Sequence, residues 1–94
     1  MTTYCWGHEK NLKLKEDRGV SFEQVVMHIE RGDLLDIIQH PNAARYPHQR
    51  ILVVRMQSYV YAVPYVEQGD ERFLKTIIPS RQLARRYAKD GHEI

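Results

Sequence analysis

The residues best suited to chemistry in this 94-residue chain are two cations on either side of a stiff corner. Lys75 lies in an apolar, strand-like run, and Arg81 follows the corner Pro79-Ser80, where a helix is expected to begin. An ammonium and a guanidinium can together neutralise a phosphate, and the first turn of a helix adds free backbone N–H groups. We therefore expect Lys75 and Arg81 to lie close together, exposed on the same side of the molecule.

The distribution of charge indicates a polyanion as the partner of this region. Residues 75–89 contain five cations and no acid, namely Lys75, Arg81, Arg85, Arg86 and Lys89. The net charge of the whole chain is only +2, so the clustering matters more than the total. Two simpler interpretations stay open. A solvated helix face would explain the arginines, and an edge-strand charge that prevents aggregation would explain Lys75.

Most other site chemistries find little support in the sequence. No glycine-rich phosphate loop is present, so we expect no nucleotide cofactor. His8-Glu9 begins like a zinc-protease motif, but the histidine that should follow is replaced by Leu12. The spacing of His40 and His48 matches no standard metal site, and a serine triad would lack its nucleophile elbow. We therefore expect no metal ion.

RNA is the polyanion that such a site could cut without a metal. No acidic cluster is available to hold Mg²⁺, so the nucleophile must come from the substrate. RNA supplies it as the 2′-OH, while lysine, arginine and tyrosine would move protons and stabilise the phosphorane. Tyrosines 59, 61 and 65 are expected on one strand face, where they would stack bases or simply cover the sheet.

Local signals place two helices before the sheet. Residues 7–17 are polar and favour a helix that ends at Gly19 in the left-handed conformation. Ser21 and Gln24 form a capping box for a second helix, which carries an apolar stripe and ends near Gly32. The tight link between them predicts an αα-hairpin.

The rest of the chain is predicted to form strands and a last helix. Residues 34–38, 50–57, 59–66 and 71–78 favour strands, with turns at 57–58 and 69–70. Pro64 cannot donate to a ladder and indicates a bulge or bend. Ser80 should cap a helix of residues 81–90 that ends at Gly91. The order predicts one α+β domain of residues 1–94.

The chain is expected to be cytoplasmic and to have no contact with a membrane. Cys5 is the only cysteine, so it cannot form an internal disulfide, and this fits a reducing compartment. No apolar run approaches the roughly 18 residues of a membrane span. The start of the chain also lacks the charged and apolar regions of a signal peptide.

Several short motifs, in their order and spacing, resemble BrnT-type toxins of bacterial toxin–antitoxin pairs. The motifs are Trp6 followed by Glu9-Lys10-Asn11, the run from Gly19 to Glu23, the closing Ile77-Ile78-Pro79-Ser80-Arg81, and Tyr87 in the final helix. The resemblance covers almost the whole chain. It implies a RelE-like fold, in which two N-terminal helices pack on a twisted antiparallel sheet of three to four strands, followed by a short C-terminal helix.

The same resemblance implies a function. It implies a toxin that inhibits translation as a metal-independent endoribonuclease, with RNA as substrate and a cognate antitoxin, a small DNA-binding protein, as partner. Operator DNA would be contacted only through the antitoxin complex. The alternative is a non-catalytic module that binds nucleic acid and antitoxin, or a subunit whose basic helix docks an acidic antitoxin segment.

The candidate site residues follow from the motifs and from the charge pattern. The resemblance places Lys75 on a basic residue of the last strand, Arg81 on the arginine of the corner, and Lys10 with Asn11 on the N-terminal motif. The candidate catalytic residues are Lys75, Arg81, Tyr87 and Lys10, and the candidate RNA-binding residues are Arg55, Arg85, Arg86 and Tyr61.

Overall fold

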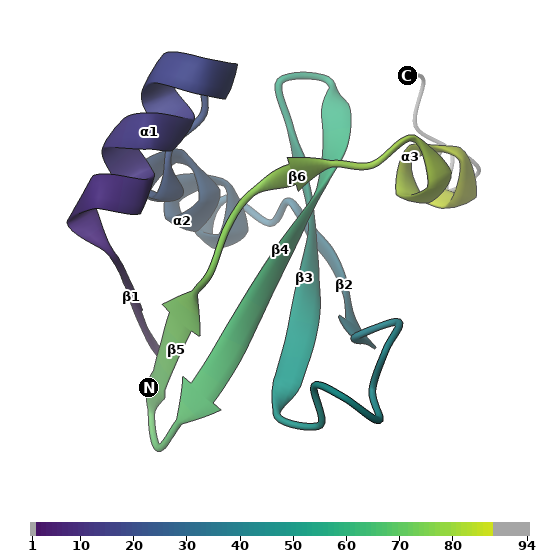
Figure 1. Ribbon diagram of the computed structural model, residues 1–94. Coiled ribbons are helices and arrows are strands. Elements are labelled where there is room, and N and C mark those ends of the chain that lie inside the picture. Colours follow the sequence, from purple (N-terminus) through teal and green to yellow (C-terminus); the bar gives the residue numbers. More distant parts are fainter. Residues whose placement is uncertain (1, 88–94) are drawn as a thin grey trace.

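The computed structural model describes residues 2–87, which form three helices and one six-stranded sheet (Figure 1). In chain order the elements are β1 (Thr3–Trp6), α1 (His8–Arg18), α2 (Phe22–Glu30), β2 (Leu34–Gln39), β3 (Gln49–Met56), β4 (Tyr59–Gln68), β5 (Glu71–Leu74), β6 (Ile78–Pro79) and α3 (Arg81–Tyr87). The sheet order is β1-β5-β4-β3-β2, and β6 pairs with β4. The predicted α+β class is confirmed. The expected end of the last helix, with Ala88, Lys89 and Gly91, lies outside the described residues.

A first strand that was not predicted makes the sheet mixed. β1 precedes both helices and runs parallel to β5, from Thr3 opposite Glu71 to Trp6 opposite Leu74. The sheet therefore corrects the prediction of three or four antiparallel strands. Four residues are too few to show a clear alternation, and the partner strand lies near the other end of the chain, so local patterns could not reveal the pairing.

The predicted helix signals are confirmed by the backbone. Gly19 ends α1 with φ of 68°, a left-handed value that glycine adopts without strain, and its N–H donates to the carbonyl of Lys15 at 3.1 Å. At α2, the Ser21 hydroxyl accepts from the N–H of Gln24 at 3.2 Å, and the Gln24 side chain accepts from the N–H of Ser21 at 2.9 Å. The chain therefore turns sharply between the two helices.

A buried amide locks the two helices together. Asn11 in α1 is only 3% exposed, and its Nδ2 donates to Oε1 of Glu23 at 2.8 Å. Its Oδ1 accepts from the backbone N–H of Phe22 at 2.8 Å, one of the N–H groups that the start of α2 leaves without an intrahelical partner. The Asn11 side chain therefore fixes the angle between α1 and α2.

The central hairpin has the predicted turn. Gln57 and Ser58 have φ of 56° and 60°, as in the two-residue turns that match the twist of a hairpin. The β3–β4 register then continues without interruption from Met56 opposite Tyr59 to Gln49 opposite Val66. Pro64 therefore produces no bulge in this ladder, and the irregular register lies instead in β2.

Pro64 lies opposite a break in the next strand. The predicted strand of residues 71–78 is two short strands, β5 and β6, separated by residues 75–77. The Pro64 carbonyl accepts from the N–H of Lys75 at 2.8 Å, but Pro64 has no N–H to donate in return. The ladder cannot continue there, and the prediction that Lys75 lies mid-strand is wrong.

The broken segment is redirected toward α1. Arg18 Nη1 donates to the carbonyl of Ile77 at 2.6 Å, and the Ile77 side chain is fully buried. Leu74 is also buried in the same core, although an unbroken strand of residues 71–78 would place Leu74 and Ile77 on opposite sides. The alternation fails because the strand ends at Leu74.

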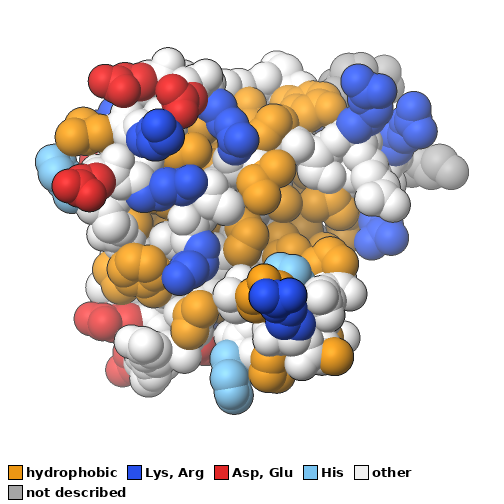
Figure 2. All heavy atoms as spheres, in the orientation of Figure 1, with side chains coloured by type: hydrophobic (Ala, Val, Ile, Leu, Met, Phe, Trp, Pro, Cys, Tyr) orange, Lys and Arg blue, Asp and Glu red, His pale blue; other side chains and the backbone are white. Residues whose placement is uncertain are grey.

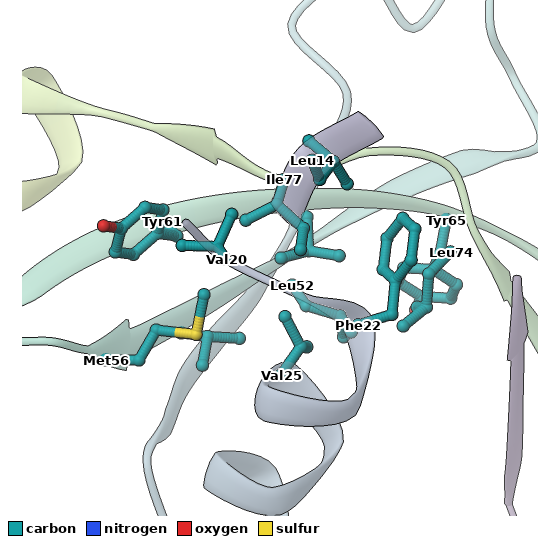
Figure 3. Close-up of a cluster of buried hydrophobic side chains, with 12 residues drawn as sticks. Leu14, Val20, Phe22, Val25, Leu52, Met56, Tyr61, Tyr65, Leu74 and Ile77 are labelled. Atoms are coloured by element: carbon teal, nitrogen blue, oxygen red, sulfur yellow. The ribbon is translucent and has the colours of Figure 1, made fainter. Parts of the chain in front are cut away.

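The sheet carries a separate apolar core on each face. Even-numbered residues of β3, with odd-numbered residues of β4, pack against α1 and α2, and Figure 3 shows Leu14, Phe22 and Val25 of this larger core. Odd-numbered residues of β3 and even-numbered residues of β4 pack against Leu83 and Ala84 of α3. Figure 1 shows α1 and α2 on one side of the sheet and α3 on the other. The described residues of α3 span about 10 Å of helix and pack on part of this face.

Candidate functional site

An open groove lies beside α3, on the sheet face opposite the helix pair. Its volume is about 530 Å³. Its floor consists of apolar residues from three adjacent strands, which are Ile38 of β2, Ile51 of β3, and Ala62 and Pro64 of β4. Figure 2 shows a hollow with hydrophobic side chains inside it and Lys and Arg side chains around it. The part of the face that α3 leaves uncovered is therefore apolar and accessible.

The walls of the groove are more polar than its floor. Ile78 and Pro79 of β6 and Leu83 of α3 continue the apolar lining on one side. The polar side chains come from the corner, from α3 and from the loop after β2, and they are Ser80, Gln82, Arg86 and His40. His40 Nδ1 accepts from the backbone N–H of Asn42 at 3.0 Å, which leaves its other ring nitrogen for a ligand. Such an arrangement suits an amphipathic ligand with an anionic edge.

Short helix α3 presents three exposed arginines, Arg81, Arg85 and Arg86. Ser80 caps the helix as predicted, because its hydroxyl accepts from the N–H of Leu83 at 3.1 Å. Leu83 and Ala84 hold the helix on the sheet, so the arginines must project away from it. Within residues 2–87, none of the three forms an ion pair. Their charges are thus available to a polyanion.

A short hydrogen bond ties the end of α3 to the edge strand. The Tyr87 hydroxyl donates to Oδ2 of Asp36 in β2 at 2.6 Å. This bond, assisted by the backbone N–H of Ile37, lowers the pKa of Asp36, and Arg86 lowers it further. The same bond raises the pKa of Tyr87, with burial adding to the effect. Tyr87 is therefore held protonated on a carboxylate, and in this arrangement its proton is not directed at a substrate.

The backbone positions beside Lys75 and Arg81 do not support the expected convergence of the two cations. The N–H of Lys75 donates to the carbonyl of Pro64, and the N–H of Ser80 donates to that of Val60, four residues earlier in β4. Four strand residues separate these points by about 13 Å. Lys75 Nζ lies 5.5 Å from the ring centroid of Phe73, on the β5 side. Both cations are exposed as expected, but the expectation that they converge depended on an unbroken strand.

Three other predicted residues also lie away from the groove. Tyr61 packs in the core beneath α1 and α2, is 9% exposed, and donates its hydroxyl to Gln57 at 3.3 Å, so neither ring face is open to a base. Lys10 is exposed on α1, across the sheet from α3. Arg55 lies half-buried in β3, and among the described residues its Nη2 has no hydrogen-bond partner.

Sequence patterns did not identify two groups of polar residues as parts of a site. His40 was weighed only as a metal ligand, but it lines the groove together with Arg86. A smaller pocket of about 210 Å³ opens elsewhere and is lined by Pro47, His48, Arg50, Tyr65 and Glu67. The predicted turn at 57–58 was a usable signal for this pocket, since it fixes the register that places Arg50 opposite Tyr65.

Three further findings concern metal ions, membrane spans and similar proteins. In the described part of the chain, no three His, Cys, Asp or Glu side chains gather closely enough to hold a metal ion. None of the helices within residues 2–87 has the length and apolar character needed to cross a membrane. Comparison with protein-family models, with curated proteins and with solved structures finds no match for this chain.

Proposed function

We propose that this protein is the toxin of a bacterial type II toxin–antitoxin pair, with a RelE-like fold, and that it acts in the cytoplasm. Its activity in this proposal is that of a metal-independent endoribonuclease, which inhibits translation by cutting RNA through attack of the 2′-OH. The observation that carries the proposal is the row of exposed arginines on α3 beside an open groove. The motifs that resemble BrnT-type toxins, from Trp6 to Tyr87, supply the specific family.

The arginines of α3 supply the affinity for RNA. Guanidinium groups bind phosphate oxygens with two parallel hydrogen bonds, and each neutralised phosphate releases counterions. Arg81, Arg85 and Arg86 belong to a helix anchored by Leu83 and Ala84, so they present their charge from a fixed support. Binding of single-stranded RNA should therefore weaken steeply as salt concentration rises.

The groove is the site proposed for the antitoxin. Its apolar floor is unsuited to a phosphate backbone but suits the apolar side of an amphipathic segment. Arg86 and His40 on its walls favour acidic residues on the other side of that segment. A segment seated there would also cover the arginines of α3 and thereby block RNA. The antitoxin is a small DNA-binding protein in this proposal, and operator DNA is reached only through the complex.

A non-catalytic binding module is the second candidate, and two observations favour it. Lys75 and Arg81 are held apart by the β4 ladder, and Tyr87 is engaged with Asp36. A protein that only bound RNA and antitoxin would keep the groove and the arginines and would need no proton-transfer groups.

Expression of the chain without a partner separates these candidates. The ribonuclease predicts growth arrest with shortened messenger RNA, whereas the binding module leaves RNA intact. Changing Arg81, Arg85 and Arg86 to alanine should relieve the arrest and reduce the salt dependence of RNA binding, by about 0.7 in log–log slope per lost phosphate contact. The matched control changes three exposed cations, Lys13 and Lys15 of α1 and Arg31 at the end of α2, to alanine. Normal growth with intact RNA in the wild type would overturn the proposed activity.

A further inference from the structure

The face covered by α1 and α2 ends in a polar pocket that is separate from the groove beside α3. Along β4 the residues of this face are Tyr61, Val63 and Tyr65 in the core, followed by Glu67 at its end. On β3 the same face continues from Leu52 to Arg50. The face therefore changes from apolar to charged, and a pocket of about 210 Å³ opens there.

The pocket brings basic and acidic side chains together, and the strand register places part of its lining. Arg50 lies opposite Tyr65, and Gln49 lies opposite Val66. His48 comes directly before β3 and Glu67 directly after Val66 in β4, and both side chains line the pocket. Residues directly opposite in an antiparallel pair have Cβ atoms about 5 Å apart. An imidazole, a carboxylate and a guanidinium are thus gathered around one small space.

A second arginine forms an ion pair with the carboxylate of Glu67. Arg72 of β5 lies opposite Glu67 in the ladder, and its Nε is 3.8 Å from Oε2 of Glu67. The Arg72 guanidinium is held between two aromatic rings, 5.1 Å from the centroid of Tyr65 and 6.0 Å from that of Tyr4, and it donates to the Tyr4 hydroxyl at 3.4 Å. Glu67 therefore lies against a cation whose own position is tightly constrained.

We propose that this pocket binds a phosphodiester of RNA and that Glu67 and His48 are the general base and general acid that cut it. The proposal rests on the ribonuclease function proposed above and replaces its earlier candidate catalytic groups. Arg50 binds the non-bridging oxygens of the phosphate, and Tyr65 forms the bottom of the pocket. The volume admits a phosphate with part of its sugar, while the arginines of α3 hold other parts of the strand.

The proposed step is balanced without a cofactor. Glu67 accepts the proton of the 2′-OH, and the 2′-oxygen forms a bond to phosphorus. The bond between phosphorus and the 5′-oxygen breaks, and His48, as imidazolium, gives its proton to that oxygen. The products are a 2′,3′-cyclic phosphate and a free 5′-OH, and Arg50 stabilises the charge that develops on the phosphorane.

Cleavage of a short RNA by the purified full chain tests the assignment. Glu67→Gln and His48→Asn should each lower the rate by about 100-fold or more. The wild type should show a bell-shaped pH profile, in which Glu67→Gln removes the acidic limb and His48→Asn removes the alkaline limb, a result that a merely structural role would not produce. The matched controls are Glu71→Gln and His8→Asn, exposed residues outside the pocket, which should keep wild-type rates.

Binding is measured apart from cleavage with inorganic phosphate. In an NMR titration, phosphate should shift the His48 ring signals and the amides of residues 47–50, and Arg50→Ala should abolish these shifts. Wild-type cleavage that persists in both Glu67→Gln and His48→Asn would overturn the pocket but leave the ribonuclease function standing. A wild type that cuts no RNA overturns both proposals, and phosphate shifts that are absent or unchanged by Arg50→Ala also overturn the pocket.

Discussion

The two faces of the sheet are covered to different degrees, and this difference separates the two candidate sites. The face beneath α1 and α2 is closed by the larger core and by the buried amide of Asn11. A small polar pocket opens at its end. The other face carries one helix of seven described residues, so an apolar groove of about 530 Å³ remains. On the face covered by α1 and α2, the pocket is large enough for a phosphate group. On the face that carries α3, the groove is large enough for a peptide segment.

The loop of residues 40–48 links the two sites. It begins with His40, which lines the groove, and ends with His48, which lines the pocket. His40 follows Ile38 of β2, which faces α3, whereas His48 precedes Arg50 of β3, which lies on the face of α1 and α2. The two ends of the loop therefore lie on different sides of the sheet. One loop therefore supplies a histidine to each site, and the two sites can be altered separately.

The largest expected difference between the two faces of the sheet is in affinity for the proposed antitoxin. Ile78→Glu places a carboxylate on the wall of the groove, where it would be buried by the partner without a counter-charge. Affinity for the proposed antitoxin should fall by about 100-fold or more, while the proposed RNA cleavage stays unchanged. Calorimetry of the purified pair measures the first, and the cleavage assay the second.

Leu12→Glu is the matched control for Ile78→Glu. Leu12 is 46% exposed on α1, and Ile78 is 41% exposed beside α3, so both changes add the same charge at similarly exposed apolar positions. The control should leave partner affinity unchanged. If the two variants weaken binding equally, the partner does not dock in the groove, and the contrast between the faces loses its functional meaning.

A smaller effect is expected on the stability of the helix-covered face. Asn11→Ala leaves the N–H of Phe22 buried without a partner and removes the bond to Glu23. The free energy of unfolding should fall by about 2 kcal/mol, measured by urea titration. Lys10→Ala, an exposed neighbour on the same helix, should change it by less than about 0.5 kcal/mol. Equal losses in both variants would mean that the amide does not lock the helices.

The elements set by neighbouring residues were predictable, and those set by distant pairing were not. Gly19, the capping box at Ser21 and the turn at 57–58 act within a few residues, and all three were predicted. β1 depends on a partner near the other end of the chain, and Asn11 bonds to α2 across the interhelical turn. Neither contact produces a local pattern.

The candidate site shows the same limit. The sequence showed the basic cluster that contains Arg85 and Arg86, and both side chains are exposed in the structure. The convergence of Lys75 with Arg81 required an unbroken strand, but Pro64 in the adjacent strand ends the ladder at Lys75. The effect of a proline on its neighbour can be inferred only after the register is known. That register follows from the turn, and it is also what reveals the His48 pocket.

The smallest expected effect concerns the attachment of α3. In Tyr87→Phe the bond to Asp36 is lost, so the pKa of Asp36 should rise toward its ordinary value, followed by NMR of its carboxyl carbon. The bond lowers the pKa of Asp36, so its stabilisation is present above the ordinary pKa of that carboxyl and is lost as pH falls through the lowered value. The bond also raises the pKa of Tyr87, so the stabilisation is lost again when pH rises through that raised value. Wild type and variant should therefore differ in stability at neutral pH and converge in acid. A difference that persists after Asp36 is protonated would assign the effect to the Tyr87 hydroxyl without the charge on Asp36. Equal stability at neutral pH would mean that the bond contributes nothing, and α3 would then be held on its face by apolar contact alone.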